Sequence, residues 1–553
     1  MAAGDYHYVI VGAGSAGCVL AGRLSADPAC QVLLLEAGGS DRKREIRIPA
    51  AFTKLLGTGY DWNYRTSKQP QLSDRQLYWP RGKTLGGSSA INGQIWTRGH
   101  RVDYDGWAQS CPGWSYDEVL PYFQRAEHRV GSNAGGVYGT LGPQFISELR
   151  DPNPTTLAFL AGCAELGLHR LEELNEPDNT GFSPAAVTQR RGLRNSAADA
   201  YVHPARRRRN LTVLTGAYAQ RILLDGARAT GVEYRDAAGV TQQVTASGEV
   251  ILSGGAVNSP QLLMLSGIGD PEQLRAVGVE PRHDLVGVGA NLQDHLACGV
   301  IVHCPKPVTL FAADSPGQLA RFLLLRRGML TSSVNEAVAF VRSDPALAAP
   351  DLELVWLPVP VLGEGLTPPP AHGVTLAVEL LQPASHGNIR LASADPAEPP
   401  VIDPSYLTAE SDLHGLVAGL RIAERLCDTA ALRPYVGPPM APWPGKVDEA
   451  KLVRFVREHA ETAFHPVGTC RMGSDDAAVV DCKLRVRGLD GLRVVDASVM
   501  PRIIRGHTHA PTVMIAERAA DLIQRRPVPD GCCVPISPIR GRGSGPLSWR
   551  GAR

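Results

Sequence analysis

The feature that most constrains the fold is a glycine motif close to the N-terminus. Gly12, Gly14 and Gly17 follow a short β-branched run, Tyr8–Val11, and precede a stretch that suits a helix. A second apolar strand, Gln31–Leu35, lies beyond that helix. A strand, a glycine turn, a helix and a second strand make a βαβ unit. The pattern predicts an α/β sheet that binds a dinucleotide.

Each glycine has its own role in such a unit. Gly12 makes the tight turn, Gly14 lets the backbone approach a pyrophosphate, and Gly17 permits close packing of helix on strand, while the helix N-terminus offers free N–H groups to the phosphates. Glu36 stands 24 residues after Gly12 and can accept hydrogen bonds from both ribose hydroxyls, while its charge repels a 2′-phosphate. These residues alone do not separate NAD from FAD. Neighbours expected to contact the nucleotide are Ser15, Ala16 and Ala37.

Composition excludes several other classes of protein. The 553 residues are 44% hydrophobic and 20% charged, which is ordinary for a globular chain with one large composite fold or two to three domains. The 56 basic and 55 acidic residues give a net charge of +1, so no overall field gathers nucleic acid or an acidic membrane. The longest uncharged apolar runs are short and contain glycines, so we expect no membrane span.

The eleven cysteines are scattered and contain no C-x-x-C pair. A disulfide framework or a zinc site would need recurring short spacings, so we expect reduced thiols, no metal site and a cytoplasmic protein. The N-terminus has no Lys or Arg before its apolar run and is a poor secretory signal. The tail, residues 527–553, is rich in Pro, Gly, Ser and Arg, and we expect it to be disordered.

Four longer segments resemble the signatures of the glucose–methanol–choline (GMC) oxidoreductases, and they occur in the order typical of that family. They are Arg81–Gly93, Gly255–Gly269, His465–Gly473, and a closing segment formed by Asp496–Pro501 and Gly506–Thr512. The resemblance implies an α/β flavoprotein fold. It has a discontinuous Rossmann-like FAD-binding domain and an α+β substrate-binding domain built on a mixed sheet.

From this resemblance we expect the chain to alternate between the two domains. The FAD-binding parts are residues 1–155, 211–299 and 461–526, and the last of these carries the active site. The substrate-binding parts are residues 156–210 and 300–460. Within them, Leu376–Leu381 is typical of a strand and Leu416–Leu426 of a helix.

The resemblance also implies that FAD is bound without a covalent bond. Family members that attach the flavin in the first signature do so through a His, and Ile91 stands at that position here. Gly86 and Gly87 do not block the approach of backbone and hydroxyl groups to a phosphate or to the flavin ring. The residues that the resemblance places against FAD are Trp62, Arg81, Gly82, Leu85, Gly86, Gly87, Ser88, Asn92, Gly93, Asp496, Ala497, His507 and Thr508.

Oxidation of an alcohol by hydride transfer needs a base for the hydroxyl proton, while the flavin N5 takes the hydride. An imidazole suits this task near neutral pH. The family match favours His465 as the base and His507 as the group that binds the alcohol or alkoxide oxygen. His509 is expected to support substrate binding, although spacing alone does not separate the roles of the last two. We also hypothesise that the helix opened by Pro511 points its positive end at the flavin pyrimidine ring.

The substrate is predicted from one carboxylate. Glu336 falls near the position at which choline-oxidising relatives place a carboxylate against the cation of their substrate. The expected substrate is therefore an alcohol, primary and cationic, such as choline or an amino sugar, and the product is an aldehyde. Oxygen or another electron acceptor would reoxidise the flavin.

Three alternatives remain open. Asp61–Asn63 and Gly328–Ser332 also resemble the fatty-acid photodecarboxylase branch of the same fold, but that branch lacks the active-site His, and Leu381 stands where its pocket Cys is expected. A hydroxynitrile lyase of this fold is the second alternative. The third is a non-catalytic flavin-binding protein, against which the presence of both His465 and His507 argues.

Overall fold

A parallel sheet forms around the first glycine motif. In the computed structural model, which describes residues 5–525, β1 (Asp5–Val11) pairs in parallel with β2 (Val32–Glu36) on one side and with β13 (Thr241–Leu252) on the other. β10 (Leu211–Thr215) extends the sheet beyond β2, again in parallel. The predicted βαβ unit is therefore present. The tail predicted to be disordered lies outside the described residues.

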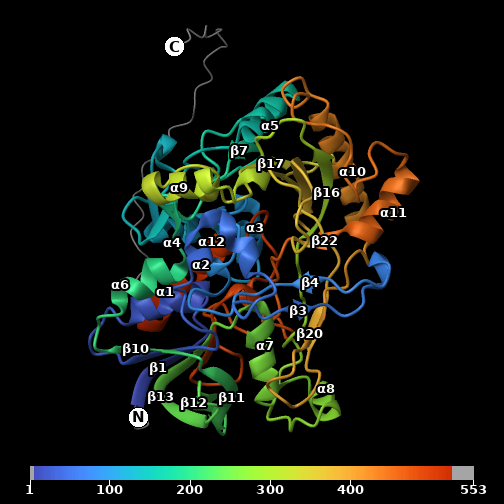
Figure 1. Cartoon of the computed structure of the whole chain (residues 1–553). Helices are drawn as coiled ribbons and strands as arrows, with labels where there is room; N and C mark the ends of the chain where they lie inside the picture. Colours follow the sequence, from blue (N-terminus) through green and yellow to red (C-terminus); the bar gives the residue numbers. More distant parts are fainter. Residues whose placement is uncertain (1–4, 526–553) are drawn as a thin grey trace.

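The same sheet continues with strands from distant parts of the chain. β11 (Tyr218–Asp225) and β12 (Arg228–Arg235) form an antiparallel extension next to β13, and β23 (Leu492–Val494) pairs with β13 in parallel. α1 (Ser15–Leu24) and α12 (His509–Gln524) pack against each other beside this sheet. Figure 1 shows β1, β11, β12 and β13 around the N-terminus, with both helices above them.

A second sheet lies on the other side of the molecule, under α5 (Pro154–Glu165) and α10 (Glu410–Cys427) (Figure 1). All its pairings are antiparallel, so the sheet that we predicted to be mixed is not mixed. Successive strands joined by loops rather than by crossover helices pair in this way. In spatial order, the strands are β22 (Glu461–Thr462), β16 (Leu296–His303), β19 (Gly373–Leu380), β18 (Leu352–Leu357), β17 (Ala337–Val341) and β7 (Gly181–Pro184).

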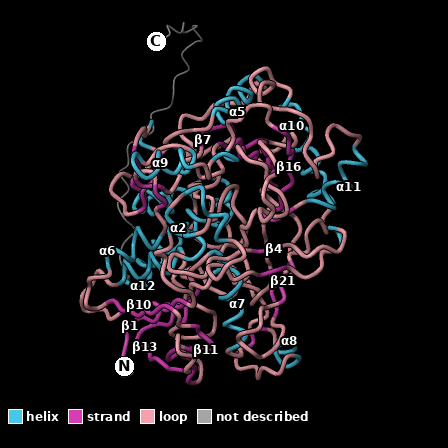
Figure 2. Tube along the Cα trace, in the orientation of Figure 1, coloured by secondary structure: helices cyan, strands magenta, loops and turns pink. Residues whose placement is uncertain are grey.

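Loops fill much of the space between the two sheets (Figure 2). The other helices are α2 (Arg44–Arg47), α3 (Arg101–Ala108), α4 (Tyr116–Ala126), α6 (His203–Ala205), α7 (Gly255–Leu265), α8 (Pro271–Ala276), α9 (Pro316–Leu325) and α11 (Glu449–His459). Short paired strands are β3 (Tyr64–Arg65), β4 (Tyr78–Trp79), β5 (Glu127–Val130), β6 (Gln144–Ser147), β8 (Gln189–Arg190), β9 (Leu193–Arg194), β14 (Ile268–Gly269), β15 (His283–Asp284), β20 (Asn388–Arg390) and β21 (Val401–Asp403). The exact boundaries of the two domains stay a prediction.

The expectation that all cysteines are reduced is wrong for one pair. Cys111, which follows α3, and Cys482 form a disulfide, with their Cα atoms 5.2 Å apart. The two residues are 371 positions apart in the sequence, so the spacing of cysteines along the chain cannot reveal the pair. Across residues 5–525, no helix is both long and apolar enough to cross a membrane.

Candidate active site

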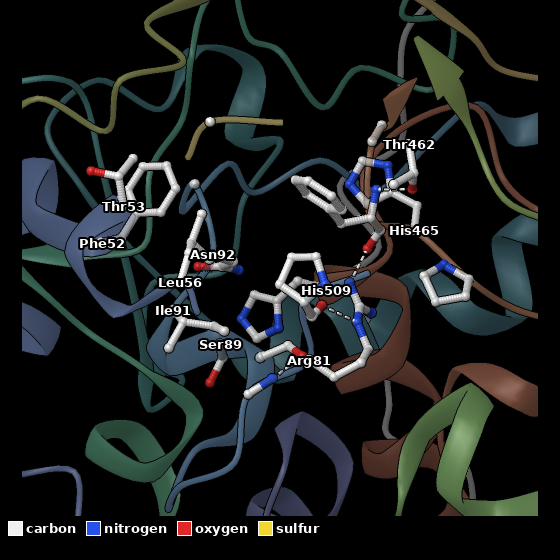
Figure 3. Close-up of a pocket in the computed structure, with 18 of the residues that line it drawn as sticks. Phe52, Thr53, Leu56, Arg81, Ser89, Ile91, Asn92, Thr462, His465 and His509 are labelled. Carbon is white, nitrogen blue, oxygen red and sulfur yellow. Dashed lines mark hydrogen bonds between the residues drawn. The ribbon is translucent and has the colours of Figure 1, made fainter. Parts of the chain in front are cut away.

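A cavity of about 950 Å³ takes its walls from both sheets. Gly12 and Gly14 line it on the side of the first sheet, while Ala377 of β19 lines it on the side of the second. His465 and His507 line the same cavity, so the glycine motif and the predicted catalytic histidines share one space. Figure 3 shows residues of several segments converging on it. Its volume suits a site for a cofactor and a small ligand.

Two glycine motifs meet on one side of this cavity. A Cβ atom on Gly17 would lie 1.9 Å from the carbonyl oxygen of Gly12, so only glycine lets α1 pack this closely on the turn after β1. Gly87 has a positive φ of +52°, and a Cβ there would lie 2.6 Å from the Cα of Gly14. The first signature segment therefore packs directly on the glycine turn.

Glu36 lies at the end of β2, with its carboxylate held by backbone donors. Its Oε2 accepts a hydrogen bond from Ala13 N–H at 2.9 Å, and its Oε1 accepts one from Gly38 N–H at 2.8 Å. Burial raises the pKa of Glu36 to about 7. Each oxygen retains a further lone pair, and the residue lines the cavity, as a ribose-binding carboxylate would.

Most of the predicted cofactor residues reach the cavity, and three do not. Gly17, Leu85 and Gly86 are not among its lining residues. Trp62 lines the cavity and stacks on Tyr64, with ring centroids 5.8 Å apart. The predicted residues that line the cavity are Gly12, Gly14, Ser15, Ala16, Glu36, Ala37, Trp62, Arg81, Gly82, Gly87, Ser88, Asn92, Gly93, Asp496, Ala497, His507 and Thr508.

The backbone around His465 is held from two sides. His465 N–H donates to Asp294 Oδ1 at 2.7 Å, and Arg81 Nη2–H donates to the carbonyl of Phe464 at 2.5 Å. Phe464 itself has a φ of +67°, which is unfavourable for a residue other than glycine. The Thr462 hydroxyl accepts from Phe464 N–H at 2.8 Å (Figure 3). These contacts hold an unusual turn that directs His465 into the cavity.

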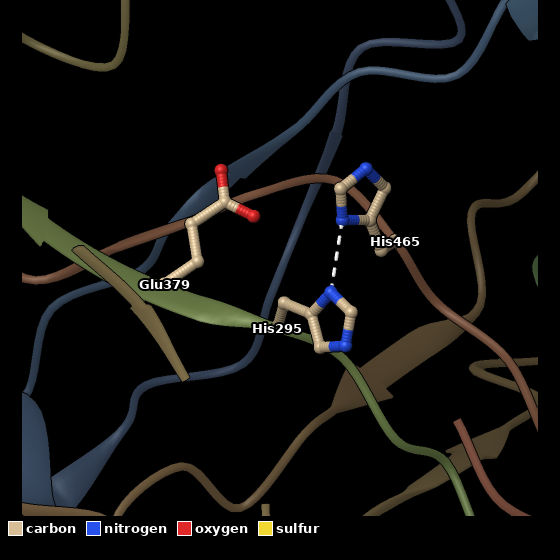
Figure 4. Close-up of side chains that lie close together, drawn as sticks. All are labelled: His295, Glu379 and His465. Carbon is tan, nitrogen blue, oxygen red and sulfur yellow. Dashed lines mark hydrogen bonds between the residues drawn. The ribbon is translucent and has the colours of Figure 1, made fainter. Parts of the chain in front are cut away.

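His295 contacts the ring of His465, and sequence reasoning missed it. The Nδ1 atoms of the two rings are 3.1 Å apart, and His295 Nε2 lies 3.1 Å from the carbonyl oxygen of Leu381 (Figure 4). His295 is fully buried, and burial lowers its pKa to about 3. Burial likewise lowers the pKa of His465 well below its usual value. A histidine at the edge of a short apolar strand gives no linear signal for this role.

His507 lies beside His465, with ring centroids 4.7 Å apart, and its pKa shifts in the opposite direction. Burial opposes its charged form, but Glu353 Oε1, 3.1 Å from Nε2, outweighs burial and raises the pKa of His507 to about 9. Glu379 faces Glu353 across the β18–β19 pair. Burial, together with the Glu353 charge, raises the pKa of Glu379 to about 8. The two carboxyl groups therefore favour the charged form of His507, while burial and the charge of Glu353 favour the protonated form of Glu379.

Glu379 is a second residue that the sequence did not reveal. It lines the cavity, and one of its carboxyl oxygens, Oε2, makes no hydrogen bond to any described residue. Potential ligand atoms of His295, Glu379 and His465 lie within 4.8 Å of one another (Figure 4). A buried polar atom without a partner is costly, so this oxygen is a candidate contact for a bound molecule.

His509, the first residue of α12, is placed against the glycine motif. Its Nδ1 lies 2.9 Å from the Ser15 hydroxyl, and its Nε2 is buried in the cavity wall without a hydrogen-bond partner among the described residues. Burial lowers the pKa of His509 to about 4. Its polar contact is thus with the nucleotide end of the cavity rather than with His465.

The structure does not bring Glu336 to the cavity. Its carboxylate is buried and accepts hydrogen bonds from Asn153 N–H at 2.7 Å, the Thr156 hydroxyl at 2.7 Å and the Ser332 hydroxyl at 2.6 Å. Asn153 is the N-cap of α5. Glu336 therefore stabilises the start of a helix, where a negative charge is favourable, and this corrects the interpretation that it faces a substrate cation.

These residues fit a dinucleotide cofactor. The close-packed glycines leave the backbone open to a pyrophosphate, Glu36 offers oxygens to a ribose, and His509 Nε2 is a buried polar atom that needs a partner from within the cavity. The histidine pair at His465 and His507 lines the same space.

Two family models, both described as GMC oxidoreductase, match residues 6–297 and 383–516. The chain belongs to the GMC oxidoreductase family. An uncharacterized GMC-type oxidoreductase of Mycobacterium tuberculosis is 51% identical over 94% of this chain and 99% of its own length. The alcohol dehydrogenase [acceptor] of Pseudomonas putida is 42% identical over 94% of this chain and 96% of its own. The crystal structure of pyridoxine 4-oxidase from Mesorbium loti superimposes with a TM-score of 0.87 at 34% identity, covering 94% and 100% of the two chains. This GMC chain is an enzyme of the oxidoreductase class.

Proposed function

We propose that this GMC oxidoreductase binds FAD and oxidises a primary alcohol to the aldehyde. The observation that carries the proposal is that one cavity holds both the two glycine motifs and the His465–His507 pair. FAD, when bound, accepts the hydride from the alcohol carbon. The relatives named alcohol dehydrogenase and pyridoxine 4-oxidase support the reaction class.

The two histidines have different roles at the alcohol oxygen. His465 is neutral, because burial lowers its pKa, so its ring nitrogen facing the cavity can accept the hydroxyl proton. His507 is an imidazolium, because Glu353 stabilises its charge, so it can stabilise the alkoxide that develops as the proton leaves. The substrate proton ends on His465, and the alcohol carbon gives up its hydride.

We further propose that FAD is held without a covalent bond. Ile91 lines the cavity at the position where a tethering histidine is found in other family members, and an aliphatic side chain forms no bond to a flavin. The checking measurement is precipitation of the purified protein with acid. A yellow supernatant is expected, whereas a yellow pellet would contradict non-covalent binding.

If the substrate is cationic, the carboxylate available to face its charge is Glu379 rather than the predicted Glu336. Glu336 accepts hydrogen bonds from three donors of its own chain, whereas Glu379 lines the cavity with an oxygen that has no hydrogen-bond partner among residues 5–525. Glu379 could face a cation, because a bound positive charge would favour its ionised form. Choline and its neutral isostere 3,3-dimethylbutan-1-ol test this directly: a preference for choline supports a cationic substrate, and equal or better use of the isostere opposes it.

One substrate panel tests the reaction. Simple primary alcohols, aryl alcohols, choline and aminoglycosides are supplied to the flavin-loaded enzyme, once with an artificial electron acceptor and once with peroxide detection. We expect acceptor-dependent formation of an aldehyde with at least one alcohol. Release of cyanide from cyanohydrins, or light-dependent loss of CO₂ from fatty acids, with no alcohol oxidised, would overturn the proposal. The acceptor and the cytoplasmic location stay predictions.

A further inference from the structure

We propose that His295 is a positioning residue that holds the His465 ring in the tautomer with a proton on Nδ1 and a bare Nε2. The inference deepens the proposed function, because a base needs its lone pair on the nitrogen that faces the substrate. It rests on the hydrogen bonds of three residues: His295, His465 and Leu381.

The first step is the tautomer of His295. Its Nε2 lies 3.1 Å from the carbonyl oxygen of Leu381, and a carbonyl oxygen only accepts hydrogen bonds, so Nε2 carries the proton. The ring is completely buried, and burial with the charge of His507 outweighs the backbone carbonyls of Leu381 and Ile504 and lowers its pKa to about 3, so it stays neutral. A neutral imidazole with a proton on Nε2 has a bare Nδ1.

The tautomer of His295 in turn determines the tautomer of His465. Its Nδ1 is 3.1 Å from the bare Nδ1 of His295, so His465 Nδ1 must carry the proton and donate it. In the other tautomer two lone pairs would face each other at this distance, which is repulsive in a buried site. The neighbouring His507 is an imidazolium bound to Glu353 and offers no acceptor that could compete. His465 Nε2 is left with its lone pair at the cavity.

Asp294, the residue before His295, also holds His465 in position. Asp294 accepts from the backbone N–H of His465, and the hydroxyls of Thr462 and Tyr406 donate to its other oxygen. The dipeptide Asp294–His295, just before and at the edge of β16, thus fixes both the backbone and the ring of His465. Two adjacent residues hold one side chain in position and in protonation state, as the partner of a catalytic histidine must.

Two substitutions, close to isosteric with each other, test the inference. His295→Leu removes the acceptor, and His295→Asn keeps a carbonyl oxygen near the position of Nδ1. Histidine-¹⁵N NMR of the alcohol-free protein, with His465→Ala used to assign the signal, reports the tautomer directly. We expect Nδ1–H on His465 in the wild type and the Asn variant, and loss of that preference in the Leu variant. Turnover should fall by about 10²-fold or more in the Leu variant, with a smaller change in KM, and recover substantially in the Asn variant.

The outcomes separate this inference from the proposed function. A wild-type spectrum with the proton on His465 Nε2, or a folded, flavin-loaded Leu variant with wild-type turnover and tautomer, overturns the role of His295. If the Leu variant does not fold, the Asn variant decides: an Asn variant that is folded but has lost the Nδ1–H tautomer contradicts the inference. Absence of alcohol oxidation by the wild type would overturn the proposed function alone, because the NMR measurement needs no turnover.

Discussion

Three neighbouring histidines carry different charges because their surroundings differ. Burial keeps His295 and His465 neutral, whereas the Glu353 carboxylate keeps His507 cationic despite its burial. A proton acceptor and a fixed positive charge therefore stand side by side at neutral pH. This pairing of opposite tendencies is how neighbouring titratable groups are assigned separate roles in acid–base chemistry.

His465→Ala tests the base at the scale of a single residue. The variant should keep its flavin, because the glycine motifs and Glu36 are untouched, but lose turnover by about 10²–10⁴-fold. Steady-state kinetics with the preferred alcohol provides the measurement. The matched control is His414→Ala on the exposed face of α10, which should leave turnover unchanged. Full activity of the His465 variant would refute its assignment as the base.

Glu379→Gln should change how stability depends on pH. Burial raises the pKa of Glu379 from its ordinary value of 4.5 to about 8, so the folded state takes up a proton that the unfolded state lacks between these values. The shifted pKa therefore lowers the free energy of unfolding of the wild type. This loss is absent below pH 4.5 and grows up to pH 8, by at most about 1.4 kcal/mol per pH unit. Relative to wild type, the Gln variant should become more stable as the pH rises, as measured by thermal melts. A constant difference from pH 5 to 8 would contradict the shifted pKa.

Sequence patterns identify individual site residues only where a local motif carries them. His465 and His507 lie in segments that resemble family signatures, and both line the cavity. His295, Glu353 and Glu379 come from three separate strands or strand edges and meet only through tertiary folding. The prediction for Glu336 failed for a related reason, because the N-cap residue of α5 to which it is hydrogen-bonded lies 183 residues earlier in the chain.

At the scale of elements, α1 and α12 form the support for the nucleotide end of the cavity. Glu517 of α12 is buried and accepts hydrogen bonds from Arg23 of α1 and from Arg125 of α4. The start of α12 then presents His509 to Ser15. Thr508 and Thr512 line the cavity at the start of this helix, and the orientation of its positive end toward a flavin ring stays a hypothesis.

Gly17→Ala tests the contact between α1 and the turn after β1. The added Cβ would lie 1.9 Å from a backbone oxygen that cannot move freely, so we expect a loss of about 1–3 kcal/mol in unfolding free energy and reduced flavin content. Chemical denaturation and the flavin-to-protein absorbance ratio measure both effects. Gly106→Ala in α3 is the control, because its Cβ meets no atom within 4 Å, and it should be neutral or stabilising. A Gly17 variant with normal flavin content and stability would contradict the packing argument.

Elements with a local hydrophobic pattern were predictable, and the pairing between distant elements was not. The βαβ unit follows from apolar runs and glycine spacing, and Leu376–Leu381 agrees with β19 to within a few residues. The second sheet has antiparallel pairing throughout, which depends on how distant strands are ordered. No local pattern encodes that order.

At the scale of the whole molecule, segments that are far apart in sequence are joined at several places. β23 returns to the first sheet beside β13, and the Cys111–Cys482 disulfide joins the loop after α3 to a segment just before β23. A cross-link over such a separation restricts the unfolded chain strongly.

Cys482→Ser should therefore lower the unfolding free energy by about 2–4 kcal/mol. Denaturant unfolding without reductant measures the loss, and peptide mapping of the unreduced wild type should recover the two cysteines in one cross-linked fragment. Cys304→Ser is the control, since this buried thiol lies outside the disulfide. Mapping that finds both residues as free thiols would contradict the pairing.

The central claim is that one cavity joins a flavin to a histidine base, and anaerobic mixing of the purified enzyme with its preferred alcohol tests it most directly. We expect a yellow protein whose flavin absorbance bleaches within the turnover time in the wild type and far more slowly in His465→Ala. A protein that stays colourless after FAD is supplied, or a flavin that no alcohol bleaches, would contradict the claim.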